Sequence, residues 1–229
     1  MEKALFFDAG PIITLVMSRL IWILPKLKEK FGGKFYITPG VKTELVERPL
    51  GIKRFEFEAL QVMKLIRDGT LEVYDKVPKS RVEQLQNLAN SSFKIKNKNM
   101  DIIQTGEMEA VTCALQTNAS AVVMDERTLR LLIENNKEME KLLEIRFKKD
   151  VQVNKDKMND FSNQLKNIKI IRSIELVAVA YKLGMLNHYM PKQRGGKTTL
   201  LDSVLWAAKY NGSAVTEQEI KEMKETLLK

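Results

Sequence analysis

Short runs of apolar residues recur along the chain and predict buried β-strands. The first, residues 3–8 (KALFFD), ends in a carboxylate, a pattern typical of a parallel strand that is buried on both faces. Further runs rich in β-branched and aromatic residues predict strands at 34–38, 71–74, 121–124 and 169–171. The pattern therefore predicts five strands, each separated from the next by a longer segment.

Apolar residues at helical spacing occupy most of those longer segments. The spacing predicts a helix from Ile12 to Leu24 that Pro25 ends or kinks, and a helix followed by a polar loop over 80–100. Other helices are expected at 41–47, 54–68, 106–116, 129–135 and 174–183. This alternation of strands and helices predicts an α/β fold whose sheet is mainly parallel.

The chain divides into a long first part and a shorter basic tail. We expect one domain over 1–187, with a charged, partly helical insertion at about 137–165. Residues 188–229 form a second unit, a basic linker (MPKQRGGKTT, 190–199) followed by helices at about 200–210 and 217–228. Thr216 and Glu219 have the spacing of a capping box for the last helix. The tail therefore reads as a small helical appendage.

The amino-acid composition excludes several kinds of functional site. The 229 residues contain one cysteine and one histidine, which excludes a disulfide scaffold, a cysteine zinc ribbon and a multi-histidine metal site. Lys and Arg exceed Asp and Glu by 38 to 29, and the resulting charge of +9 favours a polyanionic partner. Asp8 and Arg19 interrupt the apolar stretch 4–24, which argues against a signal peptide or a membrane span. We expect a soluble cytoplasmic protein.

Four acidic residues stand where strands end or helices begin. Asp8 ends the first predicted strand, Asp125 follows the fourth, Glu44 lies on the helix after the second, and Glu107 lies in the first turn of the 106–116 helix. Ligands of an open α/β sheet bind outside the carboxyl ends of its strands. Carboxylates that converge there repel one another unless a cation is present, and oxygen ligands suit Mg²⁺ or Mn²⁺. Such a site activates water for attack on a phosphate.

Five segments resemble motifs of the PIN-domain family of metal-dependent nucleases. They are FFDAGPIITL (6–15), PGVKTELV (39–46), GEMEAVTCAL (106–115), VVMDERTLR (122–130) and IELVAVAYKLGML (174–186). The resemblance implies a three-layer α/β/α sandwich that cleaves RNA with Mg²⁺ or Mn²⁺, often as a homodimer. It identifies Asp8, Glu44, Glu107 and Asp125 as the catalytic, metal-binding acids, with Glu109 and Glu126 as alternatives because the register of two motifs varies.

The chain also departs from the family pattern. Members usually carry Ser, Thr or Asn two residues after the first acid, and Gly10 stands here instead. Compact members also lack the insertion and the appendage. Two alternatives to a ribonuclease therefore stay open. One is a non-catalytic RNA-binding or ribosome-associated module, which Gly10 favours, and the other is a toxin nuclease whose partner is an antitoxin.

Basic segments supply the expected contacts with RNA phosphates. The candidate nucleic-acid-binding residues are Lys94, Lys96, Lys98, Lys148, Lys149, Lys192, Arg194 and Lys197. The segment GGKTT (195–199) resembles a phosphate loop, but Pro191 occupies the position of its first glycine and no strong strand precedes it. We therefore expect a basic linker there and not a nucleotide-binding loop.

Overall fold

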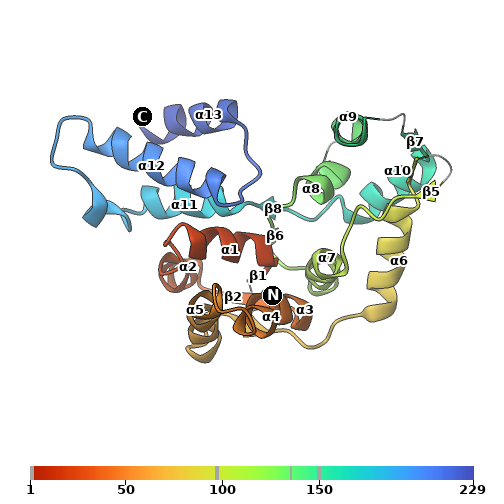
Figure 1. Cartoon of the computed structure of the whole chain (residues 1–229), viewed down its shortest axis with the longest axis horizontal. Coiled ribbons are helices and arrows are strands. Elements are labelled where there is room, and N and C mark those ends of the chain that lie inside the picture. Colours follow the sequence, from red (N-terminus) through yellow and green to blue (C-terminus); the bar gives the residue numbers. More distant parts are fainter. Residues whose placement is uncertain (1–2, 96–97, 135, 149–150) are drawn as a thin grey trace.

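The computed structural model describes residues 3–95, 98–134, 136–148 and 151–229 (Figure 1). Its central sheet has five parallel strands in the order β3-β2-β1-β6-β8. These strands are β1 (Ala4–Phe7), β2 (Lys34–Ile37), β3 (Glu72–Val73), β6 (Ala121–Val123) and β8 (Ile170–Ile171). The five predicted strands and their parallel arrangement are confirmed. Strand β1 lies at the centre, where Phe7 pairs with Ile37 on one side and Val123 on the other.

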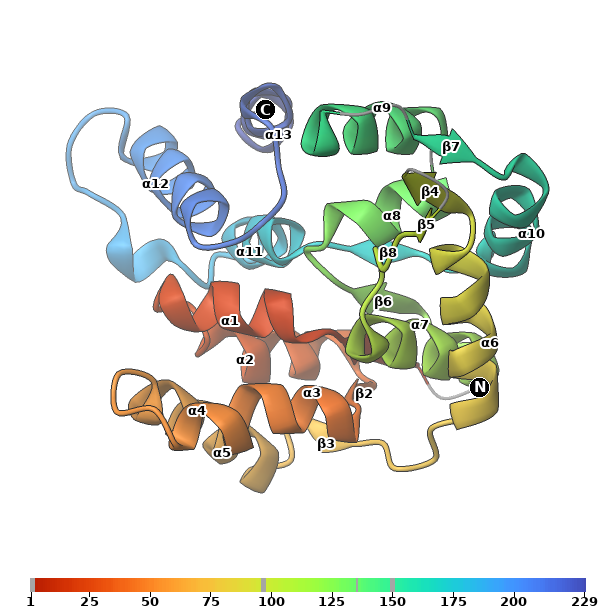
Figure 2. The same ribbon diagram turned by 45° about the vertical axis from the view of Figure 1, so that its right-hand side comes forward.

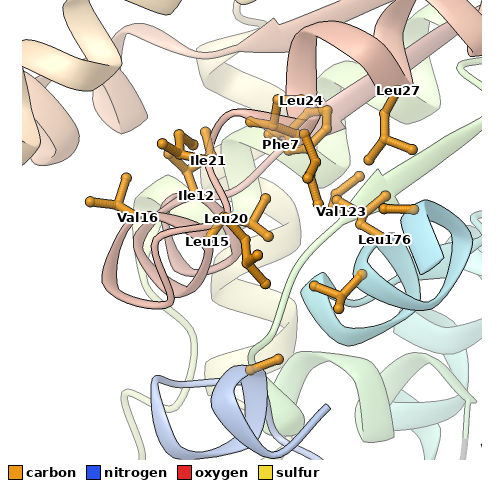
Figure 3. Close-up of a cluster of buried hydrophobic side chains, with 14 of the residues drawn as sticks. Phe7, Ile12, Leu15, Val16, Leu20, Ile21, Leu24, Leu27, Val123 and Leu176 are labelled. Carbon is orange, nitrogen blue, oxygen red and sulfur yellow. The ribbon is translucent and has the colours of Figure 1, made fainter. Parts of the chain in front are cut away.

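Successive side chains of β1 point to opposite faces of the sheet and pack into two separate hydrophobic cores. Leu5 and Phe7 face one layer of helices, and Phe6 faces the other. The first layer contains α1 (Ala9–Met17), α2 (Ile23–Phe31), α5 (Glu56–Arg67) and α11 (Ser173–Lys182). The second contains α6 (Lys79–Asn90), α7 (Thr105–Thr117), α8 (Arg127–Glu134) and α10 (Lys155–Leu165). Figure 3 shows the first core, in which Phe7 and Val123 of the sheet lie beside Leu176. The three-layer α/β/α fold is therefore confirmed.

The predicted helix from Ile12 to Leu24 is wrong in its extent. The structure has two helices, α1 and α2, and the chain turns between them at Arg19, which adopts the left-handed conformation (φ 58°). Pro25 does not end a helix but lies in the first turn of α2, where its missing N–H leaves no hydrogen bond unmade. Proline occurs both in the first turn of helices and just after their ends, and the sequence pattern alone assigned Pro25 to the end of a helix.

The predicted helix at 41–47 is present as part of a longer bent segment. It consists of α3 (Pro39–Lys42), a π-helical turn η1 (Thr43–Glu47) and α4 (Arg48–Leu50). Thr38 caps its start, because its side chain accepts a hydrogen bond from the backbone N–H of Val41. A π-turn is uncommon and is frequent at functional sites. It places Glu44 in a widened turn beside the carboxyl ends of the strands.

The polar loop predicted within 80–100 is wrong in part. Strand β4 (Phe93–Ile95) pairs antiparallel with β5 (Lys98–Asn99) and with β7 (Gln152–Val153), which forms a second, three-stranded sheet. The predicted insertion comprises α9 (Asn136–Phe147), β7 and α10. Lys94 and Lys98 are exposed while Phe93 is fully buried, so the strand presents its charged side chains to solvent. The lysine-rich pattern concealed a strand whose partner lies far along the sequence.

The C-terminal segment packs on the sandwich through α11. It comprises a 3₁₀ turn η2 (Asn187–Tyr189), α12 (Gly196–Tyr210) and α13 (Glu217–Leu227) (Figure 2). Both predicted helices are confirmed, as is the capping box, in which Thr216 and Glu219 exchange hydrogen bonds. The predicted linker is shorter than expected, because residues 196–199 form the first turn of α12 after Gly195, which adopts a left-handed conformation. No helix in the described part of the chain has both the length and the apolar character needed to cross a membrane.

Candidate active site

Asp8 occupies the junction between β1 and α1. It is the N-cap of α1, and its carboxylate accepts one long hydrogen bond of 3.4 Å from the backbone N–H of Gly10. The residue is only 7% exposed. Desolvation raises its pKa from 3.8 to about 6, the backbone N–H groups of Ala9 and Gly10 oppose this, and the charges of Glu44 and Asp125 add to it. Asp8 is thus a buried carboxylate with few donors.

Glu107 lies in the first turn of α7 and faces the same acids. Its carboxylate accepts a 3.2 Å hydrogen bond from the backbone N–H of Gln104 and so completes a capping box. Desolvation raises the pKa of Glu107 from 4.5 to about 8, although the Gln104 hydrogen bond lowers it. The negative charges of Asp8, Glu126 and Glu44 raise it further. The carboxylate is therefore surrounded by like charge.

Glu44 completes this group from the exposed side of η1. Its charge acts on both Asp8 and Glu107, which places all three acids in one neighbourhood at the carboxyl edge of the sheet. Glu44 also lines an apolar cavity of ≈ 230 Å³ whose walls include Ile13 of α1 and Phe55, just before α5. The structure therefore brings Glu44 and Glu107 into the neighbourhood of Asp8, from three different elements.

Asp125 has a different environment. Its Oδ2 accepts a 2.9 Å hydrogen bond from the Thr14 hydroxyl, and its Oδ1 accepts from the Ser173 backbone N–H at 2.9 Å and the Ser213 hydroxyl at 3.1 Å. These donors come from α1, from the start of α11 and from the segment that joins α12 to α13. Asp125 therefore ties the domain to its appendage, while its charge still reaches Asp8. Only one donor engages Oδ2, which keeps acceptor capacity for a ligand.

The hydroxyl that Gly10 does not supply comes from elsewhere. A Cβ added at Gly10 would lie 3.5 Å from Asp8 Oδ2 and 3.6 Å from the Cβ of Asp125, between the two acids. The hydroxyls of Thr14 and Ser213 are bonded to Asp125 instead. Sequence analysis missed both residues. Thr14 could have been found, since a residue four positions after Gly10 lies on the same helix face, but nothing local marks Ser213.

The two alternative acids also have defined places. Glu126 accepts a 3.0 Å hydrogen bond from the backbone N–H of Thr128 at the start of α8, and its charge acts on Glu107. Glu109 lies against α3, because a Cβ at Gly40 would be 2.7 Å from its Oε2. That oxygen is buried and makes no hydrogen bond within the described residues. Glu126 therefore lies near the group and is partly committed to capping α8, whereas Glu109 lies against α3.

The donor set fits a hard divalent cation. Asp8, Glu44 and Glu107 supply only oxygen atoms, and these three side chains form no ion pair in the part of the chain that the structure describes. No three Asp, Glu, Cys or His side chains among those residues form a ready-made metal cage. Mg²⁺ usually binds through one or two carboxylates and keeps several waters, so a closed cage is not required. The residues present therefore fit the ion that an all-oxygen site selects.

The predicted nucleic-acid-binding residues do not form one surface. Lys94 and Lys98 are exposed on the small β4–β5–β7 sheet, and Lys148 is exposed just after α9. Lys192, Arg194 and Lys197 are exposed around the start of α12, at the opposite end of the molecule (Figure 1). Lys96 and Lys149 lie outside the described residues. A role for these side chains in binding RNA stays a prediction.

Comparison with known proteins bears directly on this group of acids. A family model described as a PIN domain matches residues 4–137, more than half of the chain. The matched segment includes all four acids, Asp8, Glu44, Glu107 and Asp125, and ends within α9. No curated protein and no solved structure gives a significant match. On the strength of the family match, and with a five-stranded parallel sheet between two helical layers, the chain belongs to the PIN-domain family.

Proposed function

We propose that this protein is an endoribonuclease that requires Mg²⁺ or Mn²⁺ and hydrolyses phosphodiester bonds in RNA. The observation that carries the proposal is that Asp8, Glu44 and Glu107 lie in one neighbourhood, where the charge of Glu44 raises the pKa of both Asp8 and Glu107. None of the three has a basic partner among the described residues. Membership of the PIN-domain family supports a nuclease-like fold. The charge of +9 supports a polyanionic substrate.

In this proposal each acid has a stated role. Asp8, Glu44 and Glu107 would hold the cation, directly or through its bound waters, and Asp125 would add charge while it fixes the start of α11 and the appendage. When bound, Mg²⁺ or Mn²⁺ supplies a Lewis acid that polarises the phosphate and favours ionisation of the attacking water. No side chain needs to form a covalent intermediate with the RNA.

The raised pKa values give the proposal a second signature. Glu107, with a pKa of about 8, carries a proton at pH 7 in the free protein. A carboxylate must be ionised to bind a cation, so binding at this group releases the proton. Calorimetry of Mn²⁺ binding in two buffers of different ionisation enthalpy measures that release, and we expect a fraction of a proton or more per ion at pH 7.

The decisive experiment is cleavage of a labelled single-stranded RNA in Mn²⁺. We expect Asp8→Asn to lower the rate at least about 100-fold, equivalent to about 2.7 kcal/mol of transition-state stabilisation. Asp156→Asn is the matched control, since it makes the same change in the first turn of α10 on the exposed surface. Cleavage that survives Asp8→Asn, or that falls equally in Asp156→Asn, contradicts the assignment. Single-stranded DNA of the same sequence tests the preference for RNA.

A second candidate function follows from Gly10. Without a hydroxyl at this position, the fold could serve as an RNA-binding module that does not cleave. Mn²⁺ titration separates the two functions, because the module predicts salt-dependent RNA binding with neither Mn²⁺ binding nor cleavage. The ribonuclease predicts all three properties.

A further inference from the structure

A second cavity lies beside the candidate active site, between the domain and the appendage. It has a volume of ≈ 690 Å³ and is lined by residues of α8, α9 and α13, by the end of α12 and by the segment between α12 and α13. We call it the arginine cavity and define it by Arg127, Arg130, Glu138, Lys209, Ser213 and Glu219. Arg127 and Arg130 come from the domain, while Lys209, Ser213 and Glu219 come from the appendage. Neither part forms the cavity alone.

Basic side chains dominate its charge. Glu219, one of its two acids, is already bound to the buried Arg172 at 2.7 Å. Lys209 has a distant acidic neighbour, Glu217, at 3.8 Å on the exposed surface. Arg127 and Arg130 form no ion pair within the residues that the structure describes. The cavity therefore holds two arginines that lack the carboxylate partners surface arginines commonly have.

Arg130 supplies the observation that points to a ligand. Its Nε is buried and makes no hydrogen bond with any described residue. A buried N–H without an acceptor costs free energy, and native structures usually satisfy such groups with protein, water or ligand. The planar guanidinium presents paired donors that match the oxygens of a phosphate. An anionic oxygen inside the cavity would be bound by the terminal nitrogens of Arg130, which are not buried and make no hydrogen bond with any described residue.

We propose that the arginine cavity binds phosphate, and that the phosphate belongs to the backbone of the nucleic-acid strand on which the neighbouring site acts. Ser213 belongs to both places, because it lines the cavity and its hydroxyl donates to Asp125. A volume of ≈ 690 Å³ is larger than a single phosphate needs, which favours a longer strand as the occupant. The choice of a nucleic-acid strand rests on the proposed function, whereas the anion site does not.

The test measures binding without cleavage. A single-stranded RNA oligonucleotide and inorganic phosphate are titrated separately, in EDTA, into the full chain carrying Asp8→Asn. We expect Arg127→Gln and Arg130→Gln each to weaken RNA binding about threefold to tenfold. Each should also reduce the slope of log affinity against log salt by about 0.7, the contribution of one single-strand phosphate contact. Lys209→Gln, on the other wall, should act in the same direction.

Arg67→Gln is the matched control, because it removes the same charge from the exposed end of α5, outside the cavity. Arg127 is exposed, so its variant tests the proposal even if Arg130→Gln lowers stability. Unchanged affinity and slope for both ligands in Arg127→Gln and Lys209→Gln overturn the proposal. Loss of inorganic phosphate binding with unchanged RNA binding rejects the strand as the occupant. If the wild type binds RNA through these residues yet does not cleave it in Mn²⁺, the proposed function fails and the phosphate site stands.

Discussion

Asp8 and Asp125 follow neighbouring strands of one sheet, yet their surroundings have little in common. Both are nearly buried, at 7% and 5% exposure. The Asp8 carboxylate accepts one hydrogen bond of 3.4 Å, from the backbone N–H of Gly10, and faces the charge of Glu44. Asp125 accepts three hydrogen bonds of 2.9–3.1 Å from α1, α11 and the appendage. The same position in the fold therefore carries two different environments.

The different environments of Asp8 and Asp125 indicate different roles, one chemical and one structural. A buried carboxylate with few donors holds its charge at a cost in free energy, which a bound cation would remove. A carboxylate with several donors is already stabilised, and it holds together the elements that supply those donors. We infer that the end of β1 serves cation binding and that the end of β6 serves mainly to join the domain to its appendage. Substitutions can separate these two roles.

The largest expected effect on stability comes from the end of β6. Asp125→Ala leaves buried hydroxyl and N–H donors unpaired, and we expect the free energy of unfolding to fall by about 3 kcal/mol. Asp8→Asn should change it by less than about 1 kcal/mol, because asparagine keeps a capping oxygen and removes a buried charge. Urea unfolding followed by circular dichroism in EDTA measures both. Equal losses in the two variants would remove the contrast.

A graded pair of variants controls for general damage at Asp125. Ser213→Ala removes only one of the three donors, so its cost should be about 1 kcal/mol. Ser203→Ala is the matched change on the same appendage, where the hydroxyl bonds, among the described residues, only to the backbone carbonyl of Thr199 in its own helix. A Ser213→Ala protein as stable as Ser203→Ala would show that the bond to Asp125 contributes nothing.

The acids near the end of β1 should make the stability of the protein depend on pH. The pKa of Glu107 is about 8 in the folded protein and 4.5 as its ordinary value, so the folded state holds a proton that the unfolded state has released between these limits. The free energy of unfolding therefore falls as pH rises from about 5 to 8, and the loss is complete above the folded pKa.

Glu107→Gln removes this dependence. Relative to wild type, we expect the variant to gain a few kcal/mol between pH 5 and 9 in EDTA, because a shift from 4.5 to about 8 is worth about 1.4 kcal/mol per unit before the partial exposure of the side chain is discounted. Glu144→Gln on α9, whose side chain is exposed, is the matched control. Parallel pH profiles for wild type and Glu107→Gln would show that Glu107 is not a protonated acid. Added Mn²⁺ should restore wild-type stability at high pH and leave Glu107→Gln less affected.

Local pattern was sufficient for the five strands of the central sheet and for the acids that follow β1 and β6. The apolar runs located β1 and β6, and their order along the chain placed Asp8 and Asp125 at one edge of the sheet. Contacts between distant segments were not predictable in this way. The pairing of β4 with β7 and the bond from Ser213 to Asp125 join residues separated by more than fifty positions. No periodicity or motif at either end specifies such a partner.

The same limit explains why the arginines and the lysine of the arginine cavity were not predicted from the sequence. Sequence analysis selected runs of neighbouring lysines, such as Lys94 to Lys98, because adjacency is all that a sequence displays. Arg127, Arg130 and Lys209 are not a run, yet the packing of α12 and α13 against the domain gathers them around one cavity. The two cations of α8 lie three residues apart and share a helix face, which is the one local signal that could have been used.

The smallest expected effect concerns the glycine between the two acids. A Cβ at Gly10 meets Asp8 and Asp125 at ordinary contact distances of 3.5–3.6 Å, so Gly10→Ala should fit and raise the free energy of unfolding by about 0.5–1 kcal/mol through the unfolded state. Gly106→Ala, at the equivalent second position of α7 with open space around it, controls for helix propensity.

Gly10→Ser adds the hydroxyl that family members carry. Because Thr14 and Ser213 already donate to Asp125, we expect its cleavage rate to stay within about threefold of the Gly10→Ala rate, under 1 kcal/mol. A tenfold gain would show that the hydroxyl is needed at Asp8, where the protein offers no side-chain donor among the described residues. The different environments of Asp8 and Asp125 would then result from the absence of this one hydroxyl.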